Sequence, residues 1–398
     1  MPSPCPRSPT ALPFSARAPR FATRLVRSGL ESDAQHGAVV PPIHLSSTFS
    51  FADLGEPRRF DYTRSGNPTR CLLAEALSAA EGGAGTTITA TGMAAITVVA
   101  SLLEPGEVLA APIDCYGGSH RLFSTLHESR RLEVVWFDPD RPATLDAAFE
   151  RRPRLVWVET PSNPLLRISD LGQILSAARR VGAWVAVDNT FLSPARQNPL
   201  RLGADFAVHS TTKYINGHSD VVGGAVVSAT AELAERVDWW ANCLGLTGSP
   251  FDSYLTLRGL RTLGARLAVH EANAQAIAEL LLAQPAVERV YYPGLEEHPG
   301  HHLACQQQSG FGAMISFELR GGREAVRRFV SGLRYWSLAE SLGGVESLIA
   351  HPASMTHVVM SEEDRRCAGI GDGLLRLSVG IEDVADLASD LRAGFDRV

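Results

Sequence analysis

Short apolar segments alternate with helical segments through much of the chain, and this alternation constrains the fold more than any other feature. Helical spacing of apolar residues predicts helices at Thr69–Ala80, Ala94–Leu103 and Asp170–Val181. Strand character marks seven segments, at residues 86–90, 107–112, 132–137, 154–159, 184–188, 205–210 and 223–228. Apolar strands that alternate with helices form a mostly parallel sheet covered on both faces. We therefore expect an α/β fold built on a mostly parallel seven-stranded sheet.

The two ends of the chain differ from this central part. Val39–Phe51 is extended and stiffened by prolines, which indicates an arm lying across another surface. Phe251–Gln284 has continuous helical character, and beyond it strands at 287–292, 313–319 and 374–379 and a helix at Val384–Phe395 predict a smaller α+β domain. We expect an N-terminal extension and arm (1–63), a large domain (64–268) and a C-terminal domain (269–398). We interpret roughly the first 20 residues as a disordered extension or a start-site artefact, with an organellar transit peptide as the alternative.

Composition narrows the class of function. The net charge of −6 and the pI near 6.1 give no basic field for nucleic acid. No apolar run approaches the roughly 20 residues that span a bilayer. The six cysteines are widely scattered without a C-x-x-C pair, which is more typical of free thiols in a reducing compartment. We therefore expect a cytoplasmic protein that acts on small molecules and binds neither nucleic acid nor membrane.

Lys213 is the only lysine among the 37 basic residues, and the other 36 are arginine. Arginine replaces lysine as a surface charge or a phosphate partner. It does not replace a nucleophilic amine, because the guanidinium keeps its proton in proteins. A retained lysine therefore points to amine chemistry, above all a Schiff base.

The neighbours of Lys213 strengthen that interpretation. A Ser-Thr-Thr cluster, Ser210 to Thr212, precedes it and supplies hydroxyls for a phosphate, while Asp188 follows an apolar strand. A carboxylate at the carboxyl end of a parallel strand lies where open α/β sheets bind ligands. An amine, phosphate-binding hydroxyls and a carboxylate for a ring nitrogen together favour pyridoxal 5′-phosphate (PLP) as cofactor.

Other motifs give weaker signals. Thr91-Gly92-Met93 stands between a strand and a helix, where backbone N–H groups favour an anion. Tyr116 follows a strand and either stacks on a ring or is structural. Arg376 lies inside an apolar strand, so it needs either a substrate carboxylate or an internal acid as partner. The histidines of 298–302 lack the spacing of a zinc motif, and we predict no metal site.

Seven motifs occur in order over about residues 23–395: D-Y-T-R-S-G-N-P-T, T-G-M-A-A-I, D-C-Y-G-G-S, P-S-N-P, D-N-T-F, H-S-T-T-K-Y-I-N-G-H-S-D and A-E-S-L-G-G-V-E-S-L. This series resembles the Cys/Met-metabolism family of fold-type I PLP enzymes. Three further segments resemble the bacterial cystathionine γ-synthases within it: D-C-Y-G-G-S-H-R-L-F, W-W-A-N-C-L-G-L-T-G and F-D-S-Y-L-T-L-R-G-L-R-T-L.

The resemblance implies a role for each matching residue. Lys213 forms the Schiff base, Asp188 holds the pyridine nitrogen protonated, and Tyr116 stacks on the ring. The implied phosphate ligands are Gly92, Met93, Ser210 and Thr212, with Tyr62 and Arg64 from a neighbouring subunit. The implied substrate contacts are Arg376 for the α-carboxylate, Asn163 and Ser341 nearby, and Glu340 and Arg121 at the distal end. A shared site implies at least a dimer, and the family usually forms a tetramer of two such dimers.

The resemblance also implies a γ-replacement that makes cystathionine from O-succinylhomoserine, or another O-acylhomoserine, and cysteine in methionine biosynthesis. The chain has Arg64-Ser65-Gly66 where the enteric-type synthases have Arg-Arg-Gly, which leaves the acyl donor open. Cystathionine γ-lyase, methionine γ-lyase and O-acylhomoserine sulfhydrylase of the same family remain alternatives. A non-catalytic α/β binding protein is the alternative from another class.

Overall fold

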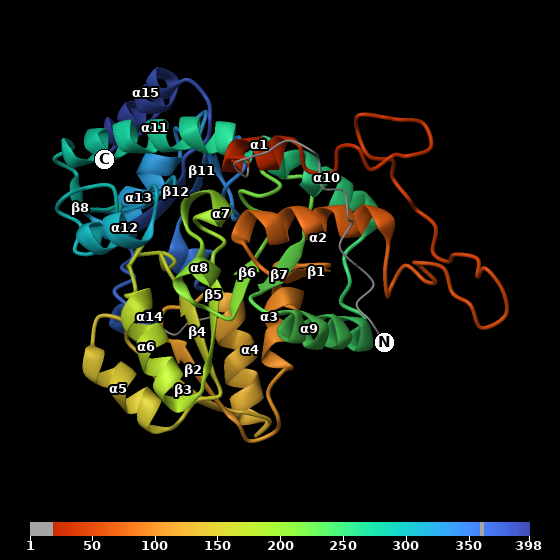
Figure 1. The fold of residues 1–398 in the computed structure, drawn as a ribbon. Helices are drawn as coiled ribbons and strands as arrows, with labels where there is room; N and C mark the ends of the chain where they lie inside the picture. Colours follow the sequence, from red (N-terminus) through yellow and green to blue (C-terminus); the bar gives the residue numbers. More distant parts are fainter. Residues whose placement is uncertain (1–18, 359–361) are drawn as a thin grey trace.

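The computed structural model describes residues 19–358 and 362–398, and these build two sheets with their covering helices (Figure 1). The expected extension over about the first 20 residues lies almost entirely outside the described range. The larger sheet has the order β1-β7-β6-β5-β4-β2-β3. Its strands are β1 (Gly85–Thr89), β2 (Val108–Pro112), β3 (Glu133–Phe137), β4 (Leu155–Glu159), β5 (Trp184–Asp188), β6 (Phe206–His209) and β7 (Gly224–Ser228). Only β7 runs antiparallel to its neighbours, so the expected seven-stranded, mostly parallel sheet is confirmed.

Helices cover both faces of this sheet because its strands are apolar on both sides. In β4, Leu155 and Trp157 pack into one core while Val156 and Val158 pack into another, as the two-residue repeat of a strand requires. The first core is completed by α3 (Gly92–Ala100), α4 (Gly117–Glu128) and α9 (Ala231–Leu244), and the second by α5 (Pro142–Glu150) and α6 (Leu171–Val181).

Helix α2 (Pro68–Glu81) shows why the chain forms helices where it does. Pro68 occupies its first turn, and the side chain of Asn67 accepts hydrogen bonds from the N–H groups of Thr69 and Arg70. The helix ends at Gly82, whose φ of 79° suits glycine. This end places Glu81 beneath the larger sheet, near the short helices α7 (Ser193–Arg196) and α8 (Pro199–Leu202).

The smaller sheet has the order β10-β11-β12-β9-β8. Its strands are β8 (Val287–Tyr291), β9 (Met314–Leu319), β10 (Ser337–Leu338), β11 (Leu348–Ala350) and β12 (Leu374–Ser378), and the accompanying helices are α11 (Leu263–Leu282), α12 (His301–Gln307), α13 (Gly322–Val330), η1 (Pro352–Ser354), α14 (Glu362–Cys367) and α15 (Val384–Phe395). The predicted domain boundary near residue 268 falls inside α11 and stays a prediction.

The continuous helix expected over Phe251–Gln284 was wrong, since α10 (Pro250–Leu260) and α11 are separate helices. The Gly259 carbonyl, which a continuous helix would use for the next turn, instead accepts from the N–H and hydroxyl of Thr262 and from the Arg266 guanidinium. These three donors close the helix one turn early, and sequence periodicity does not reveal them.

After the short helix α1 (Phe21–Val26), the N-terminal arm projects from the rest of the chain (Figure 1). It folds back on itself, with Phe49 N–H donating to Asp61 O at 2.8 Å and Thr63 N–H to Ser47 O at 2.9 Å. Leu54 is 99% exposed. The arm therefore presents apolar side chains that the other described residues leave uncovered.

Three properties of the described residues bear on the composition argument. Cys115, Cys243 and Cys305 are free thiols, as expected, whereas Cys71 is disulfide-bonded, which the spacing did not indicate. No helix in residues 19–358 or 362–398 is long and apolar enough to cross a membrane. Across the same ranges, no three His, Cys, Asp or Glu side chains gather as metal ligands would.

Candidate active site

A cavity of about 290 Å³ lies where the carboxyl ends of the larger sheet's strands face the smaller sheet. Strand β4 contributes Glu159, β5 contributes Asp188, and the loop after β6 contributes Ser210 and Lys213, while Arg376 of β12 comes from the smaller sheet. Strand ends of open α/β sheets are the usual place for a ligand. The volume is near the lower end for ligand pockets and suits a compact molecule.

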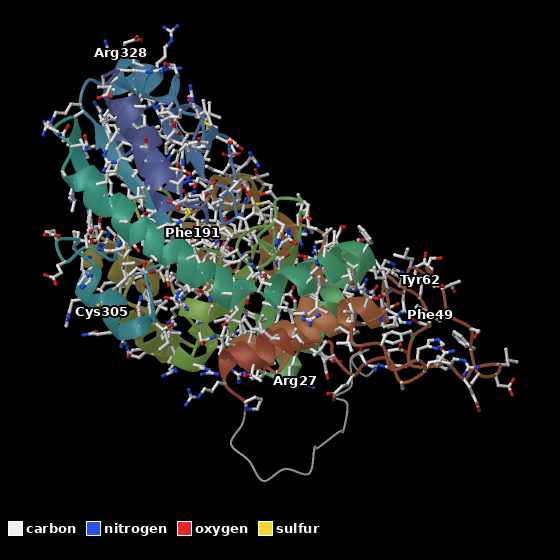
Figure 2. The ribbon with its side chains drawn as sticks, turned by 90° about the horizontal axis from the view of Figure 1, so that it is seen from above. Arg27, Phe49, Tyr62, Phe191, Cys305 and Arg328 are labelled. Atoms are coloured by element: carbon white, nitrogen blue, oxygen red, sulfur yellow. The ribbon has the colours of Figure 1, made fainter. Side chains whose placement is uncertain are left out.

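The cavity gathers eleven of the fourteen residues predicted from the sequence: Gly92, Met93, Tyr116, Asn163, Asp188, Ser210, Thr212, Lys213, Glu340, Ser341 and Arg376. The other three, Tyr62, Arg64 and Arg121, lie outside it. Tyr62 and Phe49 mark the projecting arm in Figure 2, far from Phe191 of the cavity wall. Arg64 donates to the Asn242 carbonyl at 2.9 Å, and Arg121 is exposed on α4.

Lys213 is held with its amine inside the cavity. Its Nζ donates to Ser341 Oγ at 2.8 Å, and Ser341 has the unusual φ of 87° for a residue with a side chain. Desolvation, followed by the charge of the nearby Arg376, lowers the pKa of Lys213 to about 8, while Glu340 opposes this shift. A substantial unprotonated fraction near neutral pH is what a nucleophilic amine needs.

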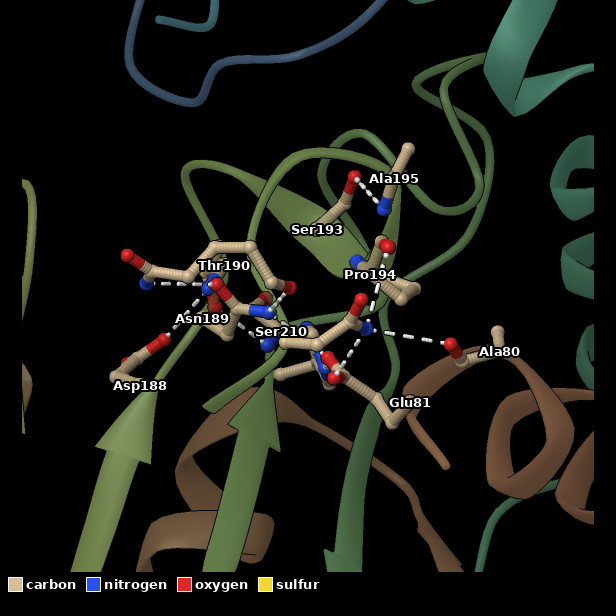
Figure 3. Close-up of polar contacts among 12 residues, drawn as sticks. Ala80, Glu81, Asp188, Asn189, Thr190, Ser193, Pro194, Ala195 and Ser210 are labelled. Atoms are coloured by element: carbon tan, nitrogen blue, oxygen red, sulfur yellow. Dashed lines mark hydrogen bonds and ion pairs between the residues drawn. The ribbon is translucent and has the colours of Figure 1, made fainter. Parts of the chain in front are cut away.

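Asp188 ends β5 with its carboxylate bordering the cavity. Its Oδ1 accepts from the N–H of Thr190 at 3.0 Å, and Thr190 Oγ1 accepts from the N–H of Ser210 at 2.8 Å (Figure 3). Thr190 thereby ties the ends of β5 and β6 together. Burial raises the pKa of Asp188, whereas the hydrogen bonds from Thr190 and the attraction of His209 lower it. The carboxylate is therefore placed to gain from a cationic partner in the cavity.

The start of α3 and the loop after β6 form a surface for an anion. Thr91 caps the helix by accepting from Ala94 N–H at 2.9 Å, so the first N–H groups face outward. A Cβ on Gly92 would lie 2.8 Å from Ser210 Cβ, so only glycine permits this close approach. The Thr212 hydroxyl donates to Gly223 O at 3.2 Å, and binding an anion would require it to exchange that bond.

Glu159 was not predicted, although it ends β4 as Asp188 ends β5. The two residues are register partners in adjacent strands. Its carboxylate accepts from Tyr116 N–H at 2.7 Å and from Trp157 Nε1 at 3.0 Å. Burial, followed by the charge of Asp188, raises the pKa of Glu159. Glu159 thus fixes the backbone that carries Tyr116, and its strand-end position was the signal that could have found it.

Arg376 is buried in β12 and has no acidic partner among the described residues. Its Nη1 donates to Asn163 Oδ1 at 2.8 Å and its Nη2 to Ser341 O at 2.9 Å. Its Nε is buried without a hydrogen-bond partner, and no ion pair within the described ranges includes Arg376. Burial lowers its pKa to about 10. Of the two alternatives left open by the sequence, an external carboxylate now has the better support.

The donor set fits PLP. The cavity combines one amine, one strand-end carboxylate, an exposed tyrosine ring and a helix N-terminus, which correspond to the aldehyde, the ring nitrogen, the ring face and the phosphate. The orphaned Arg376 Nε marks a separate place for a carboxylate. Other cavity residues that the sequence did not suggest are Ile96, Pro161, Thr190, Phe191, Val208, Val222, Leu342 and Thr356.

Comparison with known proteins identifies the same chemistry. The model of the Cys/Met metabolism PLP-dependent enzymes matches residues 22–396. Cystathionine γ-synthase of Escherichia coli K12 is 55% identical over 375 residues, covering 94% of this chain and 97% of that enzyme. Cystathionine γ-lyase of Dictyostelium discoideum is 42% identical, covering 95% and 98%. The crystal structure of cystathionine γ-synthase from Xanthomonas oryzae pv. oryzae in complex with cystathionine has a TM-score of 0.95 at 62% identity, covering 96% and 99%.

Proposed function

Because the chain belongs to the Cys/Met metabolism PLP-dependent enzymes, we propose that it forms cystathionine from an O-acylhomoserine and cysteine by γ-replacement. It is a PLP-dependent transferase with the activity of a cystathionine γ-synthase (O-succinylhomoserine (thiol)-lyase). One observation carries the proposal: the only lysine of the chain borders a cavity that also holds Asp188 and Arg376, whose Nε has no partner among the described residues. Identity of 55% and 62% to enzymes of this activity supports it.

We assign the cofactor contacts as proposals. Lys213 would bind PLP covalently, Asp188 would hold its ring nitrogen, and Tyr116 would cover its ring. The phosphate would lie on the N–H groups of Gly92 and Met93 and the hydroxyls of Ser210 and Thr212. When bound, PLP withdraws electrons from the amino acid and so makes its Cα proton acidic.

Lys213 is the proton carrier of the mechanism. An amino-acid substrate that takes its place on the cofactor frees the Nζ amine, whose low pKa leaves it ready to accept a proton. Lys213 would accept the proton from Cα and move protons between neighbouring carbons, so that the Cγ–O bond breaks and the γ-acyloxy group leaves as its carboxylate. The cysteine thiolate would then bond to Cγ, and Lys213 would return protons to Cβ and Cα. Ser341 Oγ, 2.8 Å from Nζ, holds the amine over the site between these transfers.

Arg376 would orient the substrate. Its guanidinium would bind the α-carboxylate in a two-bond fork, with Asn163 fixing one side. Glu340 borders the cavity. Arg121 lies outside it, but its positive charge is close enough to Tyr116 to oppose the rise in the pKa of that side chain. Both would face the distal part of the substrate.

The acyl donor and the balance between synthase and lyase are tested by one assay. Purified enzyme is given O-succinylhomoserine with cysteine, O-acetylhomoserine with cysteine, O-succinylhomoserine with sulfide, and cystathionine alone. We expect the first pair to give the highest kcat/KM and cystathionine as product. Faster cleavage of cystathionine would identify a γ-lyase, and faster use of sulfide would identify a sulfhydrylase.

We also propose a homo-oligomer in which two chains share each site, assembled as a tetramer of dimers in the cytoplasm and serving transsulfuration in methionine biosynthesis. The uncovered arm supports the shared site, because Tyr62 is 49% exposed and lies outside its own cavity. Tyr62 and Arg64 would then bind the phosphate in the neighbouring subunit.

Mixing two inactive variants tests the shared site. A double variant, Tyr62→Phe with Arg64→Ala, is unfolded together with Lys213→Arg and refolded as hybrids. If Tyr62 and Arg64 act in the partner's cavity, each hybrid dimer keeps one intact site, so about a quarter of native activity returns. Hybrids that stay inactive would show that each chain completes its own site.

A further inference from the structure

A buried ion pair lies beside the proposed cofactor site, at the carboxyl ends of the larger sheet's strands, and Figure 3 shows one member, Glu81, together with Asn189 and Asp188. Glu81, at the end of α2, and His209, at the end of β6, have fully buried side chains with Oε1 and Nε2 2.7 Å apart. Asp188 and Val208 are register partners in β5 and β6, so the next residues of both strands, Asn189 and His209, turn to the other face. There Asn189 Nδ2 donates to the same Glu81 oxygen at 2.8 Å.

The hydrogen bonds around Glu81 bear on the protonation state of its carboxyl group. Asn189 Nδ2 also donates to Gln197 O, and Asn198 Nδ2 donates to Ala80 O and to Glu81 Oε2. Carbonyl oxygens only accept, so these bonds fix both amides with their N–H groups toward Glu81. Amide donors on both oxygens stabilise the ionised form of a carboxyl group.

An ionised carboxylate that is wholly buried requires a counter-charge. Among the described residues bonded to Glu81, only the His209 imidazole can carry one. A charged His209 donates its Nε2–H to Glu81, while its Nδ1 is buried with no hydrogen-bond partner among the described residues. The backbone joins this pair to the cofactor site, because Asn189 N–H donates to Val208 O at 2.8 Å beside Asp188.

We propose that the Glu81–His209 ion pair is a positioning element of the cofactor site, which keeps the adjacent Asp188 charged so that the ring nitrogen of PLP stays protonated. Glu81 holds the imidazolium, and the imidazolium attracts Asp188 from the face opposite the cavity. The favourable electrostatic effect of His209 on Asp188 agrees with this direction. The inference rests on the proposed PLP chemistry and adds to it the residues that act on Asp188.

The test uses cofactor binding and the state of the ring nitrogen. The variants are His209→Gln, which keeps a donor for Glu81 without a charge, Glu81→Gln, and the double variant. Asp390→Asn is the matched control, because Asp390 is also a buried carboxylate accepting backbone N–H groups, those of Arg334, Tyr335 and Trp336, but lies in the C-terminal domain. Each apoprotein is titrated with PLP, and ¹⁵N NMR of PLP labelled at its ring nitrogen reports the ring proton.

His209→Gln should have the largest effect, because it leaves the Glu81 charge uncompensated near Asp188. Loss of such supporting groups in metal sites costs about 10- to 100-fold in affinity, and we expect about tenfold weaker PLP binding here. Glu81→Gln and the double variant should lose less, and the ¹⁵N signal should shift toward the unprotonated ring in all three. If His209→Gln does not fold, the Glu81→Gln protein supplies the same two readouts.

The inference is overturned if the variants lose thermal stability as Asp390→Asn does, but bind PLP within about twofold of the native protein and keep the protonated ¹⁵N signal. The pair would then be structural only. Failure of the native protein to bind PLP is a different result, since it would refute the proposed function itself.

Discussion

Arg376→Lys tests whether the guanidinium fork, and not only the positive charge, binds the substrate carboxylate. In the structure Arg376 Nη1 donates to Asn163 and Nη2 to Ser341 O, while Nε has no hydrogen-bond partner among the described residues. A lysine ammonium keeps the charge but is a point donor without this fixed plane. It therefore cannot hold Asn163 and make two parallel bonds to a carboxylate.

The expected fall in kcat/KM follows from the hydrogen bond that is lost. A hydrogen bond to a charged group contributes about 1.5–3 kcal/mol, so losing one of two costs about 2 kcal/mol. This corresponds to about a 30-fold lower kcat/KM. The α-carboxylate is bound equally before and during the reaction, so the loss should appear in KM with kcat nearly unchanged.

Steady-state kinetics with O-succinylhomoserine as the varied substrate and saturating cysteine measure both constants. Arg266→Lys is the matched control, because Arg266 is similarly buried, donates to the carbonyls of Ile215 and Gly259, and does not line the cavity. Both variants should lose stability, but only Arg376→Lys should change KM. A KM within about threefold of the native value, or an equal effect of the two substitutions, would refute the carboxylate role of Arg376.

Two further outcomes concern Lys213. Lys213→Arg should abolish turnover and the reduction of bound cofactor onto the chain by borohydride, because the guanidinium forms no Schiff base; mass spectrometry of the reduced protein checks this. Lys213→Met should raise the unfolding temperature of the cofactor-free protein at pH 7. Desolvation lowers the pKa of the folded-state amine to about 8, so the buried ammonium is unfavourable below that pH. The stability advantage of Lys213→Met should shrink as pH rises from about 8 toward the pKa of lysine in the unfolded chain. Calorimetry at several pH values measures it, and an advantage that grows with pH would contradict the prediction.

The sequence predicts the larger sheet well because both determinants of its strands are local. Each strand is a continuous apolar run, as in Leu155–Glu159, and each is bounded by turn or helix signals. The break between α10 and α11 was missed because it depends on Arg266 reaching back to the Gly259 carbonyl. Periodicity reports which face of a helix is apolar, but it does not report which distant side chain takes a carbonyl.

The same distinction separates the predicted site residues from the missed ones. Lys213 and Asp188 stand out because their residue type is unusual for the chain or for a strand end. Glu159 has the same strand-end position as Asp188, yet R-L-V-W-V-E alone gives no reason to choose it over a surface carboxylate. Only the register of β4 with β5 shows that the carboxyl groups of Glu159 and Asp188 face one cavity. Bound PLP has a single ring nitrogen, so only one of the two carboxyl groups can pair with it.

That pairing explains why the structure needs unequal surroundings for the two carboxyl groups. Two adjacent carboxylates without compensation do not both ionise, because each charge disfavours the other. Glu159 accepts from a backbone N–H and an indole, and burial, followed by the charge of Asp188, raises its pKa. Burial raises the pKa of Asp188 as well, but the hydrogen bonds from Thr190 and the attraction of His209 oppose that rise. The proton of the pair should therefore reside on Glu159.

Glu159→Gln, which keeps an uncharged group there, should bind PLP as the native protein does, whereas Asp188→Asn should lose the protonated ring signal in ¹⁵N NMR. Equal loss in both variants would contradict this division of roles.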